Sequence, residues 1–264
     1  MRTTIHFASL PIVLITALCP SGRADETPGS GWRSLPLIKD GRVHPDWAQI
    51  GYGGFAVEDA TLRTEPDERG LGLVLYRKEK FGNCEIRVVF KAKDAKSNSG
   101  VYVRIDEGIL KKLDEKHAPA RRDKDGKLTK ESLDTFMAAS EEGQGPWFAV
   151  HHGYEVQICD EGDAFHRTGS IYSLAKSAAP VKKPTEWKTM VIILKGDLVL
   201  VDMDDIRITT FNPAGKAVPK DRKWFEPKRE PKRPEVGYIG LQNHDPGDVV
   251  YFKEVSVRPF AKAK

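Results

Sequence analysis

Short segments in which apolar and polar side chains alternate constrain this fold more than any other feature of the chain. In residues 154–159, Val156 and Ile158 alternate with Glu155 and Gln157. Alternate residues of a strand face opposite sides of a sheet, so this segment predicts core on one side and a polar surface on the other. Comparable segments lie at 54–62, 71–76, 84–91, 100–106, 187–195, 198–203, 207–211, 237–243 and 249–258. Turn residues separate them, which predicts an all-β, two-sheet sandwich or jelly roll.

Two charged segments interrupt the strand pattern. Residues 107–147 are rich in Lys, Asp and Glu and contain a short helical pattern at 129–139, with Thr129 as the expected N-cap. The apolar stripe of this helix predicts packing against the sandwich, and a lid over a groove is the alternative. Residues 212–234 combine prolines with basic side chains. They predict a solvated loop, and a rim that attracts anionic polymers is the alternative.

The first residues are typical of a secretory signal peptide. Arg2 precedes an apolar run that is shorter than the roughly 20 residues needed to span a bilayer, and small residues follow it. We expect a signal peptide at 1–24, an N-terminal extension at 25–44 and one domain at 45–260. The protein is then exported, periplasmic or extracellular, with no membrane span.

The net charge bears on binding to nucleic acid, and the cysteine count bears on disulfide bonding. The 264 residues carry a formal net charge of +4, and removal of the predicted signal peptide, with two basic and no acidic residues, lowers it to +2. This balance does not favour nucleic acid. Beyond residue 24 the cysteines are Cys84 and Cys159. They predict two thiols, with a disulfide as the alternative in an exported protein. The oligomeric state stays open.

Three strands carry polar side chains two residues apart, which strand parity places on one face of each strand. The pairs are Tyr102 and Arg104, Glu155 and Gln157, and Gln242 and His244. If the strands are neighbours, they form a polar groove with an aromatic wall. Such grooves suit carbohydrate, because aromatic rings pack on C–H faces and polar groups pair with hydroxyls. A solvent-facing surface is the alternative, and a β-bulge would shift the parity.

Glu155 and Asp160 are candidates for the carboxylate pair of a conventional retaining glycosidase. Gln157, which lies between them in the sequence, cannot titrate, so the pair is weakly supported.

Glu155 can also act alone as a general base that removes a proton from carbon. This chemistry needs an oxyanion stabiliser, for which Arg104 and Lys78 are the candidates, and a general acid, for which His166 and His244 are the candidates. A structural ion pair between Arg104 and Glu155, and solvated histidines, are the alternatives.

The sequence predicts no cofactor and no metal-ligating residues. A divalent ion such as calcium is an open alternative, because Asp202, Asp204 and Asp205 could contribute oxygens, although a polar turn is favoured. His151 and His152 lack matching carboxylates.

Six motifs follow one another along the chain: GGFAVED at 53–59, KEKFGNCEI at 78–86, NSGVYVR at 98–104, GYEVQICD at 153–160, TGSIY at 168–172 and GLQNH at 240–244. Together they resemble the 3-keto-disaccharide hydrolase domain family over residues 45–260. The resemblance implies a concanavalin A-like jelly roll. Residues 201–205 and the long segment 106–150 depart from the family pattern, so the substrate is open.

The resemblance also implies cleavage of glycosides that are already oxidised to a ketone at the third ring carbon. The ketone acidifies the neighbouring C–H, a base removes that proton, the enolate expels the glycosidic oxygen, and water adds back. Glu155 then is the base, with Asp160 as its substitute. Sugar-binding residues are expected to be Lys78, Tyr102, Gln157, Tyr172 and Gln242. A non-catalytic carbohydrate-binding module is the alternative.

Overall fold

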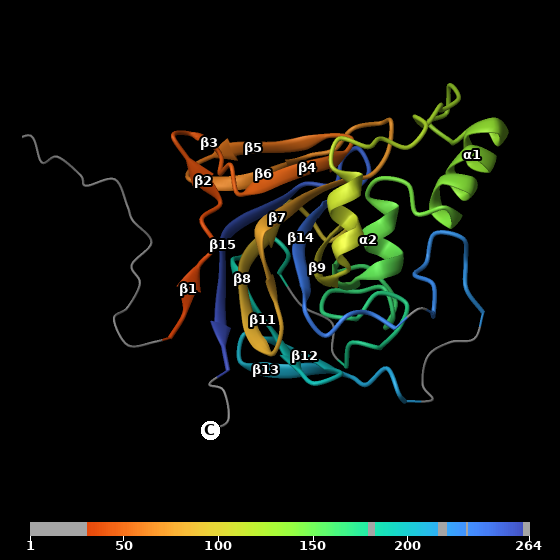
Figure 1. Cartoon of the computed structure of the whole chain (residues 1–264). Coiled ribbons are helices and arrows are strands. Elements are labelled where there is room, and N and C mark those ends of the chain that lie inside the picture. Colours follow the sequence, from red (N-terminus) through yellow and green to blue (C-terminus); the bar gives the residue numbers. More distant parts are fainter. Residues whose placement is uncertain (1–30, 179–182, 216–220, 231, 261–264) are drawn as a thin grey trace, which may run out of the picture. The chain divides into compact units, whose positions relative to one another are not determined.

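The computed structural model describes residues 31–178, 183–215, 221–230 and 232–260 (Figure 1). The predicted signal peptide lies outside these residues, so export stays a prediction. No helix of the described part is long and apolar enough to cross a bilayer.

Two antiparallel sheets form the framework, which confirms the predicted all-β jelly-roll sandwich. The larger sheet contains β1 (Arg33–Ser34), β5 (Gly54–Glu58), β6 (Thr61–Glu65), β8 (Cys84–Ala92), β11 (Lys188–Lys195), β12 (Leu198–Met203), β13 (Ile206–Phe211) and β15 (Val250–Pro259). Its order is β13-β12-β11-β8-β15-β6-β5, with β1 on β15. The smaller sheet contains β4 (Trp47–Gly51), β7 (Gly72–Phe81), β9 (Ser99–Ile105), β10 (Tyr154–Ile158) and β14 (Gly237–Asn243). Its order is β10-β9-β14-β7-β4.

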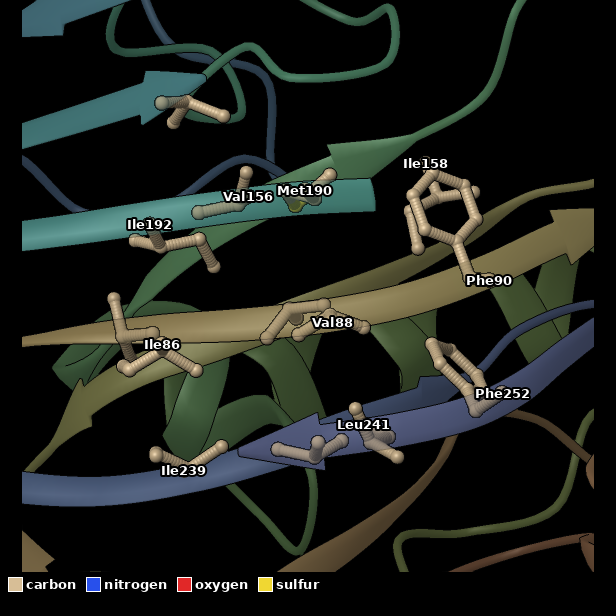
Figure 2. Close-up of a cluster of buried hydrophobic side chains, with 14 of the residues drawn as sticks. Ile86, Val88, Phe90, Val156, Ile158, Met190, Ile192, Ile239, Leu241 and Phe252 are labelled. Carbon is tan, nitrogen blue, oxygen red and sulfur yellow. The ribbon is translucent and has the colours of Figure 1, made fainter. Parts of the chain in front are cut away.

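The main core belongs to residues that alternate along these strands. In β8, Ile86, Val88 and Phe90 are fully buried, while Arg87 and Val89 between them are partly exposed. Val156 and Ile158 of β10 join the same cluster from the smaller sheet (Figure 2). Burial of one such side chain stabilises a fold by about 1.5–3 kcal/mol, and a slip of one residue would reverse every side chain, so the alternation fixes the register.

The smaller sheet is buried on its other face as well. Every residue of β9 and β14 is buried, and Tyr102 belongs to a second apolar cluster with residues of three short helices. These helices are η1 (Glu107–Lys112), α1 (Lys130–Glu141) and α2 (Trp147–His152), and α2 packs against β9 and β10 (Figure 1). The charged segment 107–147 therefore covers the face that carries the polar side chains.

Local signals at the predicted helix and hairpins are confirmed. Thr129 caps α1, because its Oγ1 accepts a hydrogen bond from the Ser132 backbone N–H at 3.2 Å. Asp59 and Ala60 turn between β5 and β6 with φ of 46° and 58°, and Gly196 turns between β11 and β12 with φ of 55°. These left-handed conformations suit the tight turns of β-hairpins.

The chain joins the sandwich earlier than the predicted domain start at residue 45. Arg33 of β1 pairs with Val257 of β15, and β2 (Ile38–Lys39) and β3 (Arg42–Val43) form a small hairpin. The described part of the predicted extension 25–44 is thus part of the fold. Strands of two residues are too short to show an alternation of apolar and polar side chains, so the sequence pattern did not predict β1, β2 and β3.

The cysteines and the acidic run have ordinary roles. Cys84 and Cys159 are free thiols, as predicted. Asp202 forms an ion pair with Arg207, and the Asp204 carboxylate accepts a backbone N–H of β11 at 2.8 Å. No group of three or more His, Cys, Asp or Glu within the described ranges is arranged to hold a metal ion.

Candidate active site

A cavity of about 350 Å³ lies over the face of the smaller sheet that is turned away from the main core. Its floor is polar and its walls are mostly apolar. The lining residues are Leu71, Asn98, Arg122, Leu128, Phe136, Trp147, Val150, Glu155, Gln157, Tyr172, Trp224, Phe225, Gln242, His244 and Asp245.

Three neighbouring strands place a hydrogen-bonded trio at the floor, in which Glu155 and Gln242 line the cavity and Tyr102 is buried. Glu155 of β10 pairs in register with Tyr102 of β9, and Tyr102 is opposite Gly240 of β14, two residues before Gln242. The Tyr102 hydroxyl donates to Glu155 Oε2 at 2.8 Å, and Gln242 Nε2 donates to the Tyr102 oxygen at 2.9 Å. The carboxyl group is therefore held in one orientation by a donor that is itself fixed.

Gly100 leaves the space that the Glu155 side chain occupies. A Cβ atom added at Gly100, which is opposite Gln157 in the pairing of β9 and β10, would lie 2.3 Å from Glu155 Oε1. Carbon and oxygen atoms cannot approach so closely, so a larger residue at position 100 would force the Glu155 side chain to move. This glycine belongs to the NSGVYVR motif.

Burial changes the acidity of Glu155. The side chain is nearly inaccessible, with the residue 8% exposed. Burial raises the pKa of Glu155 to about 7, and the hydrogen bond from Tyr102 and the charge of His244 only partly oppose this. A carboxyl with a pKa near 7 is an efficient general base at neutral pH, because about half of it is ionised and the ionised form binds a proton well.

A second set of hydrogen-bonding groups runs from Glu155 to His244. One end of the Gln157 amide lies 3.1 Å from Glu155 Oε1 and 3.1 Å from the Ser99 carbonyl oxygen, and its other end lies 3.1 Å from the Asn98 amide. The Asn98 amide nitrogen lies 3.2 Å from His244 Nε2. Gln157 is thus in contact with protein groups at both ends of its amide.

His244 is held by carboxylates on its other side. Its Nδ1 lies 2.8 Å from Asp248 Oδ2. Desolvation lowers the pKa of His244, but the hydrogen bond to Asp248 and the negative charges of Asp245, Asp248 and Glu155 outweigh this, and the pKa is raised above its ordinary value. The imidazolium form of His244 therefore persists to higher pH than that of an ordinary histidine.

Aromatic side chains form much of the wall. Phe136 of α1, Trp147 of α2, Tyr172, and the neighbouring Trp224 and Phe225 surround the cavity, and the Trp147 and Trp224 ring centroids are 5.7 Å apart. Aromatic walls of this kind pack on the C–H faces of sugar rings.

Three buried polar atoms of the lining residues have no hydrogen-bond partner among the described residues. They are the donors Trp147 Nε1 and Arg122 Nε and the acceptor Gln242 Oε1. Unpaired buried polar atoms cost about 1–3 kcal/mol each, so a ligand with hydroxyl groups that pairs with them gains affinity.

Arg122 brings a second positive charge to the cavity. Its Nη2 lies 3.2 Å from Asp245 Oδ1, and its Nη1 donates to the Gly126 carbonyl oxygen at 3.0 Å. Arg122 therefore takes the place in the cavity wall that the sequence pattern gave to Arg104.

The prediction that Arg104 faces the groove is wrong. Arg104 adopts φ of 52°, and the pairing of β9 with β14 shifts register between Tyr238 and Gly240. This irregularity breaks the strand parity from which its direction was inferred. The Arg104 guanidinium instead donates to the carbonyl oxygen of Gly196, in the turn between β11 and β12.

Four further predicted residues do not line the cavity: Lys78, Asp160, His166, and Tyr102, which is buried and holds Glu155. Lys78 is largely exposed and forms an ion pair with Asp46 at 3.4 Å. The Asp160 side chain, beyond the end of β10, does not line the groove, and its buried carboxylate pairs with the buried Lys188 Nζ at 3.3 Å. Neither a stabilising charge from Lys78 nor a second catalytic carboxylate from Asp160 is available there.

His166 lies behind the wall, with its ring against Tyr172 at a centroid distance of 5.1 Å. Its Nδ1 contacts Asp163 at 2.9 Å and its Nε2 contacts Glu226 at 3.4 Å. His166 is thus in contact with a wall residue and does not itself line the cavity. Tyr172 does line it, and burial raises the pKa of this phenol, which keeps it protonated.

Five of the lining residues were predicted from the sequence, and most of the wall was not. The predicted residues are Glu155, Gln157, Gln242, His244 and Tyr172. The missed residues are Leu71, Asn98, Arg122, Leu128, Phe136, Trp147, Val150, Trp224, Phe225 and Asp245. Two aromatic pairs inside otherwise polar segments could have indicated this wall. They are Trp147-Phe148 and Trp224-Phe225.

The fold is shared with solved structures. Two crystal structures of candidate glycosyl hydrolases from Parabacteroides distasonis align with TM-scores of 0.55 and 0.57 at 21% and 16% identity. The alignments cover 87% and 88% of this chain and 99% and 94% of those chains. A Bacillus subtilis protein of unknown function with a galectin-like fold aligns with a TM-score of 0.51 at 13% identity, over 86% of this chain and 97% of that one. At these identities the likeness shows the fold alone.

The sequence comparison is more specific. None of the curated proteins matches this chain. The profile of the family described as the 3-keto-alpha-glucoside-1,2-lyase-like domain matches residues 30–258. Since this range spans most of the chain, the protein belongs to the family of 3-keto-alpha-glucoside-1,2-lyase-like domains.

Proposed function

We propose that this protein cleaves 3-keto-glycosides by removing the proton next to the ketone, with Glu155 as the base. One observation carries the proposal: a buried carboxyl with a pKa of about 7 lies on the floor of a cavity. The family description supports it, because a 1,2-lyase acts by elimination across the first two ring carbons. Export of the protein, predicted from its first residues, would place this activity outside the cytoplasm.

The reaction balances with groups that line the cavity. Glu155 takes the proton from the second ring carbon, and the electron pair of that C–H bond forms the enolate of the 3-ketone. The enolate then expels the glycosidic oxygen from the first carbon, and that oxygen takes a proton from the His244 imidazolium. Arg122 adds positive charge that favours the enolate oxygen. Hydration of the product is the same sequence in reverse, with water in place of the alcohol.

Paired-carboxylate chemistry has less support. Asp160 is bound to Lys188 outside the cavity, and Asp245, the other carboxylate of the lining, is paired with Arg122. A retaining glycosidase needs a free nucleophile beside its acid. Elimination next to a ketone needs one base, which agrees with the single carboxyl on the floor.

The first experiment offers purified protein a 3-keto disaccharide beside its unoxidised parent and detects products by mass spectrometry. Cleavage of the keto sugar alone is expected, because only the ketone makes the C–H acidic. Cleavage of the parent at a comparable rate would refute the elimination route. Sugar binding without cleavage of either would leave a carbohydrate-binding module.

The second experiment tests Glu155 itself. Glu155→Gln keeps the shape and removes the base, and we expect kcat to fall by at least about 100-fold, as is typical for loss of a general base. Glu161→Gln, an exposed position six residues on, is the matched control and should leave the rate unchanged. An unchanged rate in Glu155→Gln would show that another group is the base.

A further inference from the structure

Glu155 and His244 are joined by two side-chain amides in succession. The contacts are 3.1 Å from Glu155 Oε1 to the Gln157 amide, 3.1 Å from there to the Asn98 amide, and 3.2 Å from Asn98 to His244 Nε2. Asp248 ends the chain at His244 Nδ1, 2.8 Å away. An amide has a donor end and an acceptor end, so the direction of one amide in such a chain fixes the direction of the next.

Each direction of the chain requires a different distribution of protons. If the Gln157 nitrogen faces Asn98, its oxygen lies 3.1 Å from Glu155 Oε1, and two oxygens at this distance need a proton between them. Glu155 is then protonated, and Asn98 donates to a neutral His244 Nε2. If both amides turn over, Gln157 donates to an ionised Glu155, and the Asn98 oxygen accepts from Nε2–H of a His244 imidazolium.

A backbone group distinguishes the two directions. The end of the Gln157 amide that faces Glu155 also lies 3.1 Å from the carbonyl oxygen of Ser99. A carbonyl oxygen can only accept a hydrogen bond. The Ser99 carbonyl therefore has a donor when the Gln157 nitrogen faces it, and meets a second oxygen when the Gln157 oxygen faces it. Ser99 is fully buried in β9, so its carbonyl cannot turn away. The fixed carbonyl thus favours the direction with Glu155 ionised and His244 protonated.

We propose that Gln157 and Asn98 are positioning residues that form an amide relay, which couples loss of the proton from Glu155 to gain of a proton by His244. The resting site is held as carboxylate and imidazolium, the base and the acid in their active forms. This coupling is a property of the free protein, and only its catalytic use rests on the proposed function.

The relay follows the elimination step by step. When Glu155 takes the proton from carbon and His244 gives one to the leaving oxygen, the site holds a protonated carboxyl and a neutral imidazole. Both amides then turn, so that Gln157 accepts from Glu155 and Asn98 donates to Nε2. Addition of water reverses each transfer, returns the amides and restores the donor to the Ser99 carbonyl. The number of protons on the pair is the same before and after.

Other groups also act on the two ends. Tyr102 and Tyr172 face Glu155, and Asp245, itself paired with Arg122, acts on His244 beside Asp248. Their effects do not pass through the amides. A test of the relay must therefore separate coupling through Asn98 from direct attraction between the two charges.

A mutant cycle on the free protein makes this separation. The pKa of His244 is measured by NMR of ¹⁵N-labelled histidine, with His244→Gln assigning its signal among the seven histidines. It is measured in the wild type, Glu155→Gln, Asn98→Ala and the double variant. We expect Glu155→Gln to lower the His244 pKa by about one unit, the size at which two groups titrate as a pair. In the Asn98→Ala background the same substitution should change it by less than half as much.

Equal shifts in both backgrounds would overturn the relay, because they would show direct attraction alone. Gln157→Leu cuts the chain at its other link and must reduce the coupling in the same way, which keeps the test valid if Asn98→Ala is poorly folded. No substrate is needed, so failure of the relay and failure of the proposed function are separate results. If both hold, Asn98→Ala should also lower kcat more than it changes KM.

Discussion

Replacement of Glu155 by glutamine should stabilise the protein, and more so as the pH rises. The ordinary pKa of the carboxyl is 4.5 and burial raises it to about 7 in the folded state. The folded protein thus binds this proton more tightly than the unfolded chain. The stability that the proton contributes is complete below about 4.5 and is lost as the pH rises through about 7. Glutamine at the same position does not titrate.

The size of the effect follows from the shift. A difference of about 2.5 pKa units, at 1.36 kcal/mol for each unit, amounts to about 3 kcal/mol. With the residue only 8% exposed, solvent screens little of it. The free energy of unfolding of Glu155→Gln, minus that of the wild type, should therefore grow by about 3 kcal/mol between pH 4.5 and pH 8.

Urea denaturation followed by tryptophan fluorescence measures this difference at several pH values, since the chain has five tryptophans. Titrating groups other than His244, whose pKa this substitution is expected to lower, are common to both proteins and cancel to first order. Glu161→Gln is the control, and its difference from the wild type should stay flat. A flat difference for Glu155→Gln, or one that shrinks with rising pH, would show that burial does not raise the pKa of Glu155.

Three further outcomes are expected. Tyr102→Phe removes a hydrogen bond that lowers the pKa of Glu155, so the acid limb of the pH profile of kcat/KM should move up by about one pH unit. An acid limb that stays in place or moves down would show that this hydrogen bond does not lower the pKa of Glu155. Trp224→Ala opens the aromatic wall, and steady-state kinetics should show KM raised about five- to tenfold with kcat nearly unchanged. A fall in kcat alone would place this ring at the reacting atoms. Lys188→Met leaves the buried Asp160 carboxylate unpaired and should destabilise the fold by about 3–5 kcal/mol in urea denaturation, whereas a loss below about 1 kcal/mol would mean that Asp160 reaches water.

Strand parity was enough to predict the floor of the cavity. Glu155 and Gln242 lie on strands whose apolar partners are in the main core, and the alternation fixes which way each side chain points. Parity failed at Arg104, because a residue with positive φ and a shift in pairing reverse the direction of the side chain, and nothing in the local sequence marks that point. Asp160 follows the end of β10, where the strand rule no longer applies.

The walls could not be predicted in the same way. Phe136, Trp147 and Trp224 come from the helices and the loop that lie outside the alternating segments. Their positions depend on how the long connections fold back onto the sheet, and connections have no period from which a direction can be inferred. The sequence predicted that 107–147 and 212–234 were unusual, but not that both contribute to one cavity.

This division between floor and wall has a consequence for how such a protein can diverge. Of the groups that would move protons, Glu155 is on β10 and His244 directly follows β14. The other faces of these strands are bound into the core, so the geometry of the two groups resists change. Most of the aromatic residues that would meet the ligand, Tyr172 excepted, are on two surface connections that can vary in length and composition without altering a strand. A new ligand preference can therefore arise by exchange of residues 107–147 or 212–234 while the proton-transfer groups stay where they are, and chimeras that swap these connections between relatives are a practical route to altered selectivity.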